Sequence, residues 1–256
     1  MADDTHPLTD SAGQPWAGRH FEQNPSSGDD GSAPPQLMES IARFQAGTAG
    51  ESEVVEAFRH SRLLIPLLAV LGEAGVNEHG KKIDKSQELS IVTVGGPDGR
   101  TVLPVFSSVA AMAAWNAKAR PVPADGVRVA LAAASENTDL VVLDPTSATE
   151  FAIRRPALWA VAQQREWSPS YASPAVAAEF ARLVADEAAV VSVALAAGDP
   201  TARLAGPELA VQLTLIDGLD ATQLDSLLER LSTRWSQSEL VAESVDSLAV
   251  TLTRIS

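Results

Sequence analysis

The residues best placed for chemistry are two serines, Ser107 and Ser108, which follow an apolar, strand-like run at 101–106. A serine at a strand-to-helix turn can act as a nucleophile, and the first turn of a helix can bind a phosphate group. A nucleophile elbow also needs glycines on both sides of the serine, and neither flank of this pair has one. The alternative is that one of the two serines caps the helix that we expect to end near Trp115.

The other reactive residue types are few and scattered. The chain has no cysteine, so it can form no disulfide, zinc ribbon or thiol nucleophile. Its four histidines, at positions 6, 20, 60 and 79, do not stand at metal-ligand spacing from one another or from carboxylates. Neither a Walker motif nor a dinucleotide-binding glycine motif occurs. We therefore predict no metal and no cofactor, and the sequence favours a protein without catalytic activity.

The densest basic cluster consists of Lys81, Lys82 and Lys85, beside Asp84. It could contact RNA or an acidic protein, or it could be a solvated loop. The formal net charge of the chain is −14, and an acidic chain repels the phosphate backbone of nucleic acids. We therefore expect a protein partner, and the charge of the chain disfavours nucleic-acid binding.

Residues 1–33 are rich in Asp, Ser, Gly and Pro, so they cannot bury enough apolar surface to offset the ordering of the chain. We predict a disordered acidic tail. Trp16 and Phe21 are its exceptions, and they either dock on the folded part of the chain or form a short partner-binding motif. The tail does not resemble a signal peptide, and no apolar run is long enough to span a membrane, so we expect a cytoplasmic protein with no membrane contact.

Apolar periodicity over residues 34–167 predicts an N-terminal mixed α/β domain. Its expected elements are helices at 34–45, 51–60, 107–115, 125–136 and from 156, and strands at 62–71, 88–94, 100–106, 140–143 and 151–154. The strands at 88–94 and 100–106 are predicted to form a central hairpin across Gly95–Gly99. Pro66 and Pro104 donate no ladder hydrogen bond, so we expect each at a sheet edge or a bulge.

Residues 168–256 predict a second, smaller domain. Ser173 and Pro174 are a helix cap and a first-turn proline, and apolar positions then follow in the order helix, strand, strand, helix, strand. This order favours a small antiparallel sheet with helices on one face. The predicted fold class of the whole chain is α+β.

Three segments carry a family resemblance: VVEAFRHSRLLIP at 54–66, TVLPVFSS with a tryptophan at 101–115, and LVVLDP at 140–145. They resemble the SseB N-terminal domain family of bacterial proteins, and residues 204–220 are similar to the C-terminal region of SseB-like proteins from high-GC bacteria. The resemblance implies an α/β-type N-terminal domain and no established activity. Rhodanese-like sulfur transfer, to which the family name has been linked, needs a persulfide-bearing cysteine, and this chain has none.

Three functional hypotheses follow. The first is a non-catalytic interaction or regulatory protein with an exposed aromatic patch near Phe106, Trp115 or Trp159. The second is a small-molecule binder or enzyme near the 101–115 segment, and the third is an RNA- or ribosome-associated protein. The candidate binding or interaction residues are Asp84, Lys85, Arg100, Phe106, Ser107, Ser108 and Trp115. The partner's identity and the oligomeric state stay open at this point.

Overall fold

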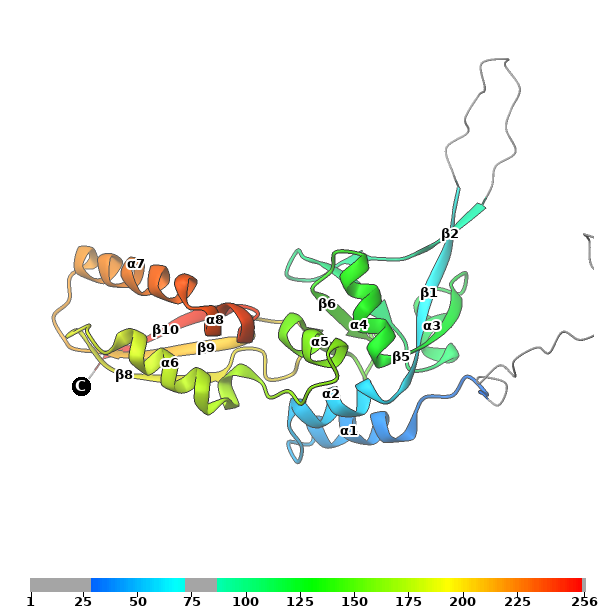
Figure 1. Cartoon of the computed structure of the whole chain (residues 1–256), viewed down its shortest axis with the longest axis horizontal. Helices are drawn as coiled ribbons and strands as arrows, with labels where there is room; N and C mark the ends of the chain where they lie inside the picture. The colour runs from blue at the N-terminus through cyan, green and yellow to red at the C-terminus, as the bar shows by residue number, and fades with distance from the viewer. Residues whose placement is uncertain (1–28, 72–86, 255–256) are drawn as a thin grey trace, which may run out of the picture. The chain divides into compact units, whose positions relative to one another are not determined.

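The structure is a computed structural model that describes residues 29–71 and 87–254 (Figure 1). All the helices and strands below belong to one unit, Gly31–Ser256. Helices, antiparallel ladders and two parallel ladders occur together, which confirms the predicted α+β class. The predicted acidic tail lies almost entirely outside the described residues, as do Trp16, Phe21 and the lysine cluster. The predicted division of the chain at residue 168 stays a prediction.

The first half of the unit contains two sheets with helices packed around them. The elements are α1 (Pro35–Gln45), α2 (Glu51–Arg59), β1 (Arg62–Leu71), β2 (Gln87–Ile91), β3 (Val94–Gly95), β4 (Thr101–Val105), α3 (Val109–Trp115), β5 (Arg120–Asp125), α4 (Gly126–Ser135), β6 (Leu140–Leu143), β7 (Phe151–Arg154) and α5 (Arg155–Ala162). The strand orders are β2-β1-β5 and β3-β4-β6-β7, and only β4 and β6 run parallel. The largest core packs Leu37 and Phe58 from the first two helices against Leu103 and Leu143.

Side-chain caps mark the N-terminal starts of α3 and α4. The Ser108 Oγ atom accepts a 3.1 Å hydrogen bond from the Ala111 N–H, so Ser108 is the serine that caps α3. The Asp125 side chain caps α4 in the same way, by accepting a 2.8 Å bond from the Arg128 N–H. The residue after that cap, Gly126, must be a glycine. A Cβ there would lie 2.4 Å from the carbonyl oxygen of Phe58, closer than side-chain atoms can approach.

The predicted central hairpin is only partly correct. β3 and β4 pair across the glycine turn for two positions, Val94 with Val102 and Gly95 with Thr101. The longer strand before them, β2, pairs with β1 instead, with Ile91 opposite Leu67. All five residues of β2 pair with β1, because the apolar β1 strand continues to Leu71. After the tight turn, β3 pairs only with the first two residues of β4.

Pro66 contradicts the expectation of an edge position, because it lies on the central strand β1, opposite Pro121 of β5. The proline pair breaks no ladder bond there. The backbone N–H and C=O groups of Leu64 both form hydrogen bonds with Phe106, on the side of β1 away from β5. Backbone direction alternates along a strand, so the backbone groups of residue 66 point to that same side.

The expectation is also wrong for Pro104, which lies on the inner strand β4, opposite Val142 of β6. The Asp144 N–H bonds to the Val105 carbonyl, so the nitrogen of Pro104 faces away from β6, at a position beyond Val102 where the β3 ladder has ended. Sequence analysis also missed β5, whose two prolines hid the strand.

The second half contains a single three-stranded sheet. Its elements are the 3₁₀ turn η1 (Ser170–Ala172), α6 (Pro174–Val184), β8 (Val190–Ala197), β9 (Leu209–Leu215), α7 (Ala221–Gln237), α8 (Glu239–Ser244) and β10 (Leu248–Arg254). Leu209, Val211, Leu213 and Leu215 alternate along β9 and face the buried side chains of α6 and α7, so both helices cover one face. The predicted fully antiparallel sheet is wrong in one ladder, because β10 runs parallel to β9. The α7–α8 crossover returns the chain to the end where β9 began.

Candidate functional site

The aromatic residues of the 101–115 segment form a small core. The rings of Phe106 and Trp115 lie 5.2 Å apart, together with Leu64 and Met112. Phe106 is fully buried, and its N–H and C=O bond to Leu64 at 2.9 and 2.8 Å. Trp115 is half-buried at the edge of this cluster. The cluster attaches α3 to β1, and its aromatic surface is largely used by that contact.

Ser107 and Asp144 come together directly after the parallel strands β4 and β6. The Asp144 carboxylate accepts bonds from the Ser107 N–H at 2.8 Å, the Ser107 hydroxyl at 2.7 Å and the Thr149 hydroxyl at 2.9 Å. The carboxyl ends of parallel strands are where open α/β sheets place their ligands. Ser107 is only 2% exposed, however, and its hydroxyl proton is already donated to Asp144. The pair joins the two strands and fixes the loop after β6.

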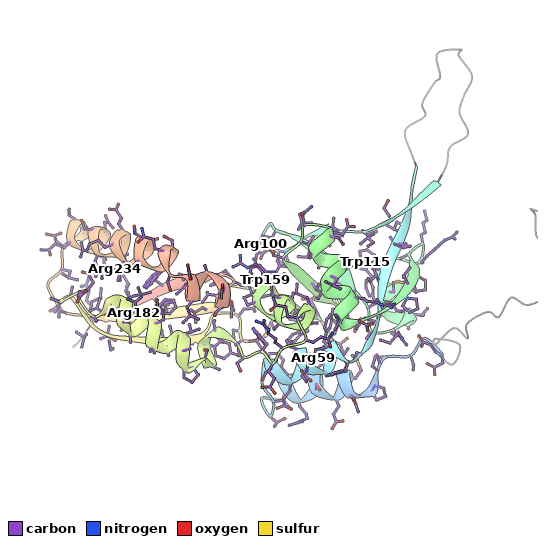
Figure 2. The ribbon with its side chains drawn as sticks, in the orientation of Figure 1. Arg59, Arg100, Trp115, Trp159, Arg182 and Arg234 are labelled. Atoms are coloured by element: carbon purple, nitrogen blue, oxygen red, sulfur yellow. The ribbon has the colours of Figure 1, made fainter. Side chains whose placement is uncertain are left out.

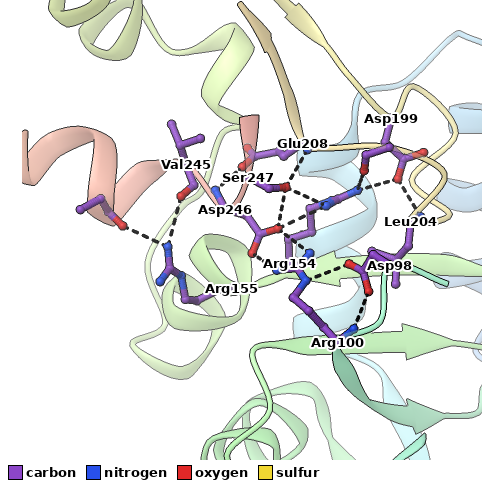
Figure 3. A network of polar contacts seen from close by, with 12 residues as sticks. Asp98, Arg100, Arg154, Arg155, Asp199, Leu204, Glu208, Val245, Asp246 and Ser247 are labelled. Atoms are coloured by element: carbon purple, nitrogen blue, oxygen red, sulfur yellow. Dashed lines mark hydrogen bonds and ion pairs between the residues drawn. The ribbon is translucent and has the colours of Figure 1, made fainter. Parts of the chain in front are cut away.

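Arg100 lies far from that pair, in the polar network at the other end of β4 (Figure 3). Its guanidinium donates two bonds to the Asp246 carboxylate, at 3.0 and 2.9 Å, and one to Asp98 at 2.8 Å. The structure therefore groups Phe106, Ser107, Ser108 and Trp115 in one segment but places Arg100 in a different environment. Asp84 and Lys85 lie outside the described residues.

Arg154, the last residue of β7, is the centre of the network in Figure 3. Its buried guanidinium donates to Asp199 at 2.7 Å, to the Gly206 carbonyl at 2.8 Å and to Asp246 at 3.2 Å. Burial by itself would raise the pKa of Asp246, but hydrogen bonding from Arg100 and the charges of Arg100 and Arg154 outweigh it, so the pKa is lowered. Sequence reasoning missed Arg154. Its only local signal is an arginine that ends an otherwise apolar strand.

A second buried polar group lies between α2 and η1. The Tyr171 hydroxyl donates a 2.9 Å hydrogen bond to Glu51, and burial raises the pKa of Glu51 to about 7. Burial likewise raises the pKa of Glu208, which accepts bonds from the Ser170 and Asp246 N–H groups at 3.2 and 2.6 Å. Glu51 is therefore a carboxyl group that can exchange a proton near neutral pH.

The exposed aromatic residue that the sequence singled out, Trp159, lies on α5 (Figure 2). It forms part of the wall of a cavity of about 300 Å³. We call this the Trp159 cavity; its lining residues are Ala130, Ala133, Ala134, Asn137, Thr138, Asp139, Arg155, Leu158 and Trp159. The indole is 44% exposed. The cavity thus has an apolar floor from α4 and α5, an aromatic wall and a polar end.

Arg155 holds the aromatic wall in place. Its guanidinium carbon lies 5.2 Å from the Trp159 ring centroid, a cation–π distance. The same guanidinium donates 3.2 Å bonds to the carbonyls of Ala242 and Val245, at the C-terminal end of α8, where a positive charge is favourable. Arg154 and Arg155 are therefore adjacent residues with separate roles, since the first is buried among carboxylates and the second supports Trp159.

A larger groove of about 690 Å³ runs between α1, α2 and residues 165–168. Several of its charged lining side chains pair with one another: Arg43 bonds to Glu53 at 3.0 Å, and Arg59 bonds to Glu56. The Trp159 cavity presents a tryptophan that is 44% exposed, whereas Trp167 in the groove is partly buried. It is therefore the better candidate for a binding site.

In the part of the chain that the structure describes, no group of three or more His, Cys, Asp or Glu side chains is arranged to hold a metal ion. No helix there is long and apolar enough to cross a membrane.

No curated protein and no solved structure matches the chain. The SseB protein N-terminal domain matches residues 36–160, which confirms the family predicted from the sequence. Those residues hold both the Ser107–Asp144 pair and the Trp159 cavity, and this part of the chain is an SseB N-terminal domain.

Proposed function

We propose that this SseB-like protein is a non-catalytic interaction module that binds a polypeptide segment at the Trp159 cavity. The observation that carries the proposal is the 44% exposed indole of Trp159 at the wall of a cavity with an apolar floor. Exposed tryptophans beside apolar pockets dominate the energetics of many protein interfaces. The proposed setting is the cytosol, which suits a chain that contains no cysteine for disulfides.

The rigidity of the cavity supports the proposal. Ala130, Ala133 and Leu158 are all buried, so the floor is part of the packed core. Arg155 restrains the indole through the ring contact and through two carbonyls of α8. A site that is already ordered loses little conformational entropy when a partner binds.

The cavity also indicates the chemistry of the partner. About 300 Å³ accommodates one large apolar or aromatic side chain, and Leu131 continues the apolar surface along α4 because it is 55% exposed three residues before Ala134. Asp139 lies at the polar end of the cavity, and the whole chain is acidic. The proposed partner segment therefore presents an apolar anchor with lysine or arginine beside it.

The test is selection of peptides from a displayed random library on the full-length protein, followed by titration of a selected peptide. We expect an apolar anchor flanked by basic residues, and we expect Trp159→Ala to weaken binding at least tenfold. Ile216→Ala is the matched control, because Ile216 is 41% exposed and lies outside the cavity. Equal binding by both variants, or no selected peptide, would contradict the proposal. Stabilisation by a metabolite panel, unaffected by Trp159→Ala, would favour small-molecule binding instead.

A further inference from the structure

The sheets of this protein protect several of their outer strands from pairing with another chain. On β5, Pro121 and Pro123 lie opposite Pro66 and Leu64, at positions that face away from β1, so they remove N–H groups from the open edge. On β7, the Ala152 N–H donates to the carbonyl of Ala202 at 2.6 Å, so a following segment covers that edge. On β8, the register shifts between residues 190 and 192, which bends one end of the strand.

The outer strand β10 has none of these features. Its seven residues, LAVTLTR, contain no proline, pair with β9 in unbroken register and carry no charge before Arg254. The Leu209 N–H donates to the Ser247 carbonyl at 3.0 Å, so position 247 faces β9. Because backbone direction alternates along a strand, Leu248, Val250 and Leu252 direct their N–H and C=O groups away from the sheet. Such an edge is a template for another strand.

We propose that β10 pairs antiparallel with β10 of a second copy of this chain, so that two three-stranded sheets join into one continuous sheet. A two-fold axis through Thr251 pairs all seven residues of the strand. Val250 then lies opposite Leu252 of the other copy, and such pairs exchange both backbone hydrogen bonds. Thr251 meets its own counterpart as a non-hydrogen-bonded pair, the arrangement in which side chains approach most closely.

The apolar side chains at this edge favour a second copy as the occupant. Leu252 lies on the face of β10 that is aligned with the buried Leu213 of β9, yet it is 38% exposed. In the antiparallel pairing, Val250 of the other copy covers it, and the reverse contact forms by symmetry. The same strand therefore supplies both the exposed apolar residue and the residue that covers it.

Charge selects the antiparallel direction. The one charged residue of β10, Arg254, comes beside the start of the other copy's strand, and the residues before that start include the exposed Glu239 and Glu243. Parallel pairing would instead place the two Arg254 side chains together. Attraction of this kind opposes the general repulsion between two copies with a net charge of −14 each, so we expect the dimer to strengthen as salt screens that repulsion.

The experiment measures the mass of the full-length protein in solution by sedimentation and light scattering over a range of concentrations. We expect a dimer for the natural sequence and a monomer for Thr251→Lys, because two lysines would meet at the two-fold axis. Thr251→Asp is also expected to be monomeric, and an equimolar mixture of the two variants is expected to restore the dimer. Thr251 is exposed, so neither substitution disturbs the core.

Ala194→Lys is the matched control. Ala194 on β8 and Thr251 on β10 both align with Gln212 of β9, so the three residues form one row on the uncovered face of the sheet. The control is expected to remain dimeric. A monomeric natural protein at every concentration would overturn the inference. A dimer that survives Thr251→Lys, or that Ala194→Lys dissociates while Thr251→Lys does not, would also overturn it.

Discussion

Arg154 and Asp246 form a 3.2 Å ion pair in which both side chains are almost completely buried. They belong to different parts of the fold, since Arg154 ends β7 and Asp246 lies just before β10. Arg100 completes the arrangement from the β3–β4 turn by binding the same carboxylate with two nitrogens. The contact therefore connects the first sheet region to the three-stranded sheet through charge, beside the apolar contacts that Ala202 and Leu204 of the β8–β9 loop make with the first region.

Arg154→Met is expected to lower the free energy of unfolding by about 3–5 kcal/mol, because it leaves the buried Asp199 carboxylate without its arginine partner and leaves Asp246 with Arg100 alone. Urea denaturation at neutral pH measures the loss. Arg182→Met is the control, because Arg182 forms its ion pair with Glu179 on an exposed helix surface and should shift the urea midpoint very little. Similar midpoints for the two variants would show that the Arg154 network contributes little to stability.

Asp144→Ala is expected to cost more stability than Ser107→Ala. Removal of the carboxylate leaves the Ser107 N–H without its acceptor in a buried position, a loss of about 1–3 kcal/mol, and also releases Thr149. Ser107→Ala removes one of three donors and keeps the N–H bond, so we expect about 1 kcal/mol. Thermal and urea unfolding measure both values. The reverse order would contradict a structural role for this pair.

The sequence predicted the elements whose signals are local. Ser173 and Pro174 mark the start of α6, and Asp125 marks the start of α4, because a cap acts on residues only three positions away. β5 was missed because Pro121 and Pro123 resemble a turn, and only the facing strand shows that their ring nitrogens point out of the ladder. The parallel direction of β10 likewise depends on a crossover, which apolar periodicity does not encode.

The candidate sites were less predictable because their partners are distant in sequence. Arg154 meets Asp199 across 45 positions and Asp246 across 92. Ser107 and Asp144 could each be identified as turn residues, but only the pairing of β4 with β6 brings them together. Trp159 was named as a candidate surface residue from its type alone, and its cavity depends on the packing of α4 against α5.

Thr146→Gly is expected to stabilise the protein by about 0.5–1 kcal/mol. Thr146 has a φ of 65°, a left-handed conformation that is strained for a β-branched residue and unstrained for glycine. Differential scanning calorimetry measures the gain as a higher melting temperature. The same substitution at Thr149 provides the comparison, because there it removes a hydrogen bond to Asp144 and should lower the melting temperature. Destabilisation at both positions would refute the strain argument.

Stability is expected to fall with rising pH through the titration of Glu51. Burial raises its folded-state pKa from 4.5 to about 7; the charges of Glu208 and Asp199 raise it further, while the Tyr171 hydrogen bond and Arg154 lower it. Below pH 4.5 both folded and unfolded states hold the proton. Between pH 4.5 and about 7 the unfolded state loses it first, so the folded state loses stability on the order of 3 kcal/mol.

Glu51→Gln isolates this effect, because glutamine keeps an oxygen for the Tyr171 hydroxyl and does not ionise. Urea unfolding of both proteins at pH 5 and pH 8 should show a variant whose advantage over the natural sequence grows with pH. Glu56→Gln on the same helix should differ from the natural protein by nearly the same amount at pH 5 and pH 8. Hydrogen bonding from Arg59 lowers the pKa of Glu56 below 4.5, so its ionised form already stabilises the folded state at pH 5. A constant difference between Glu51→Gln and the natural protein would mean that Glu51 is already ionised in the folded state at pH 5.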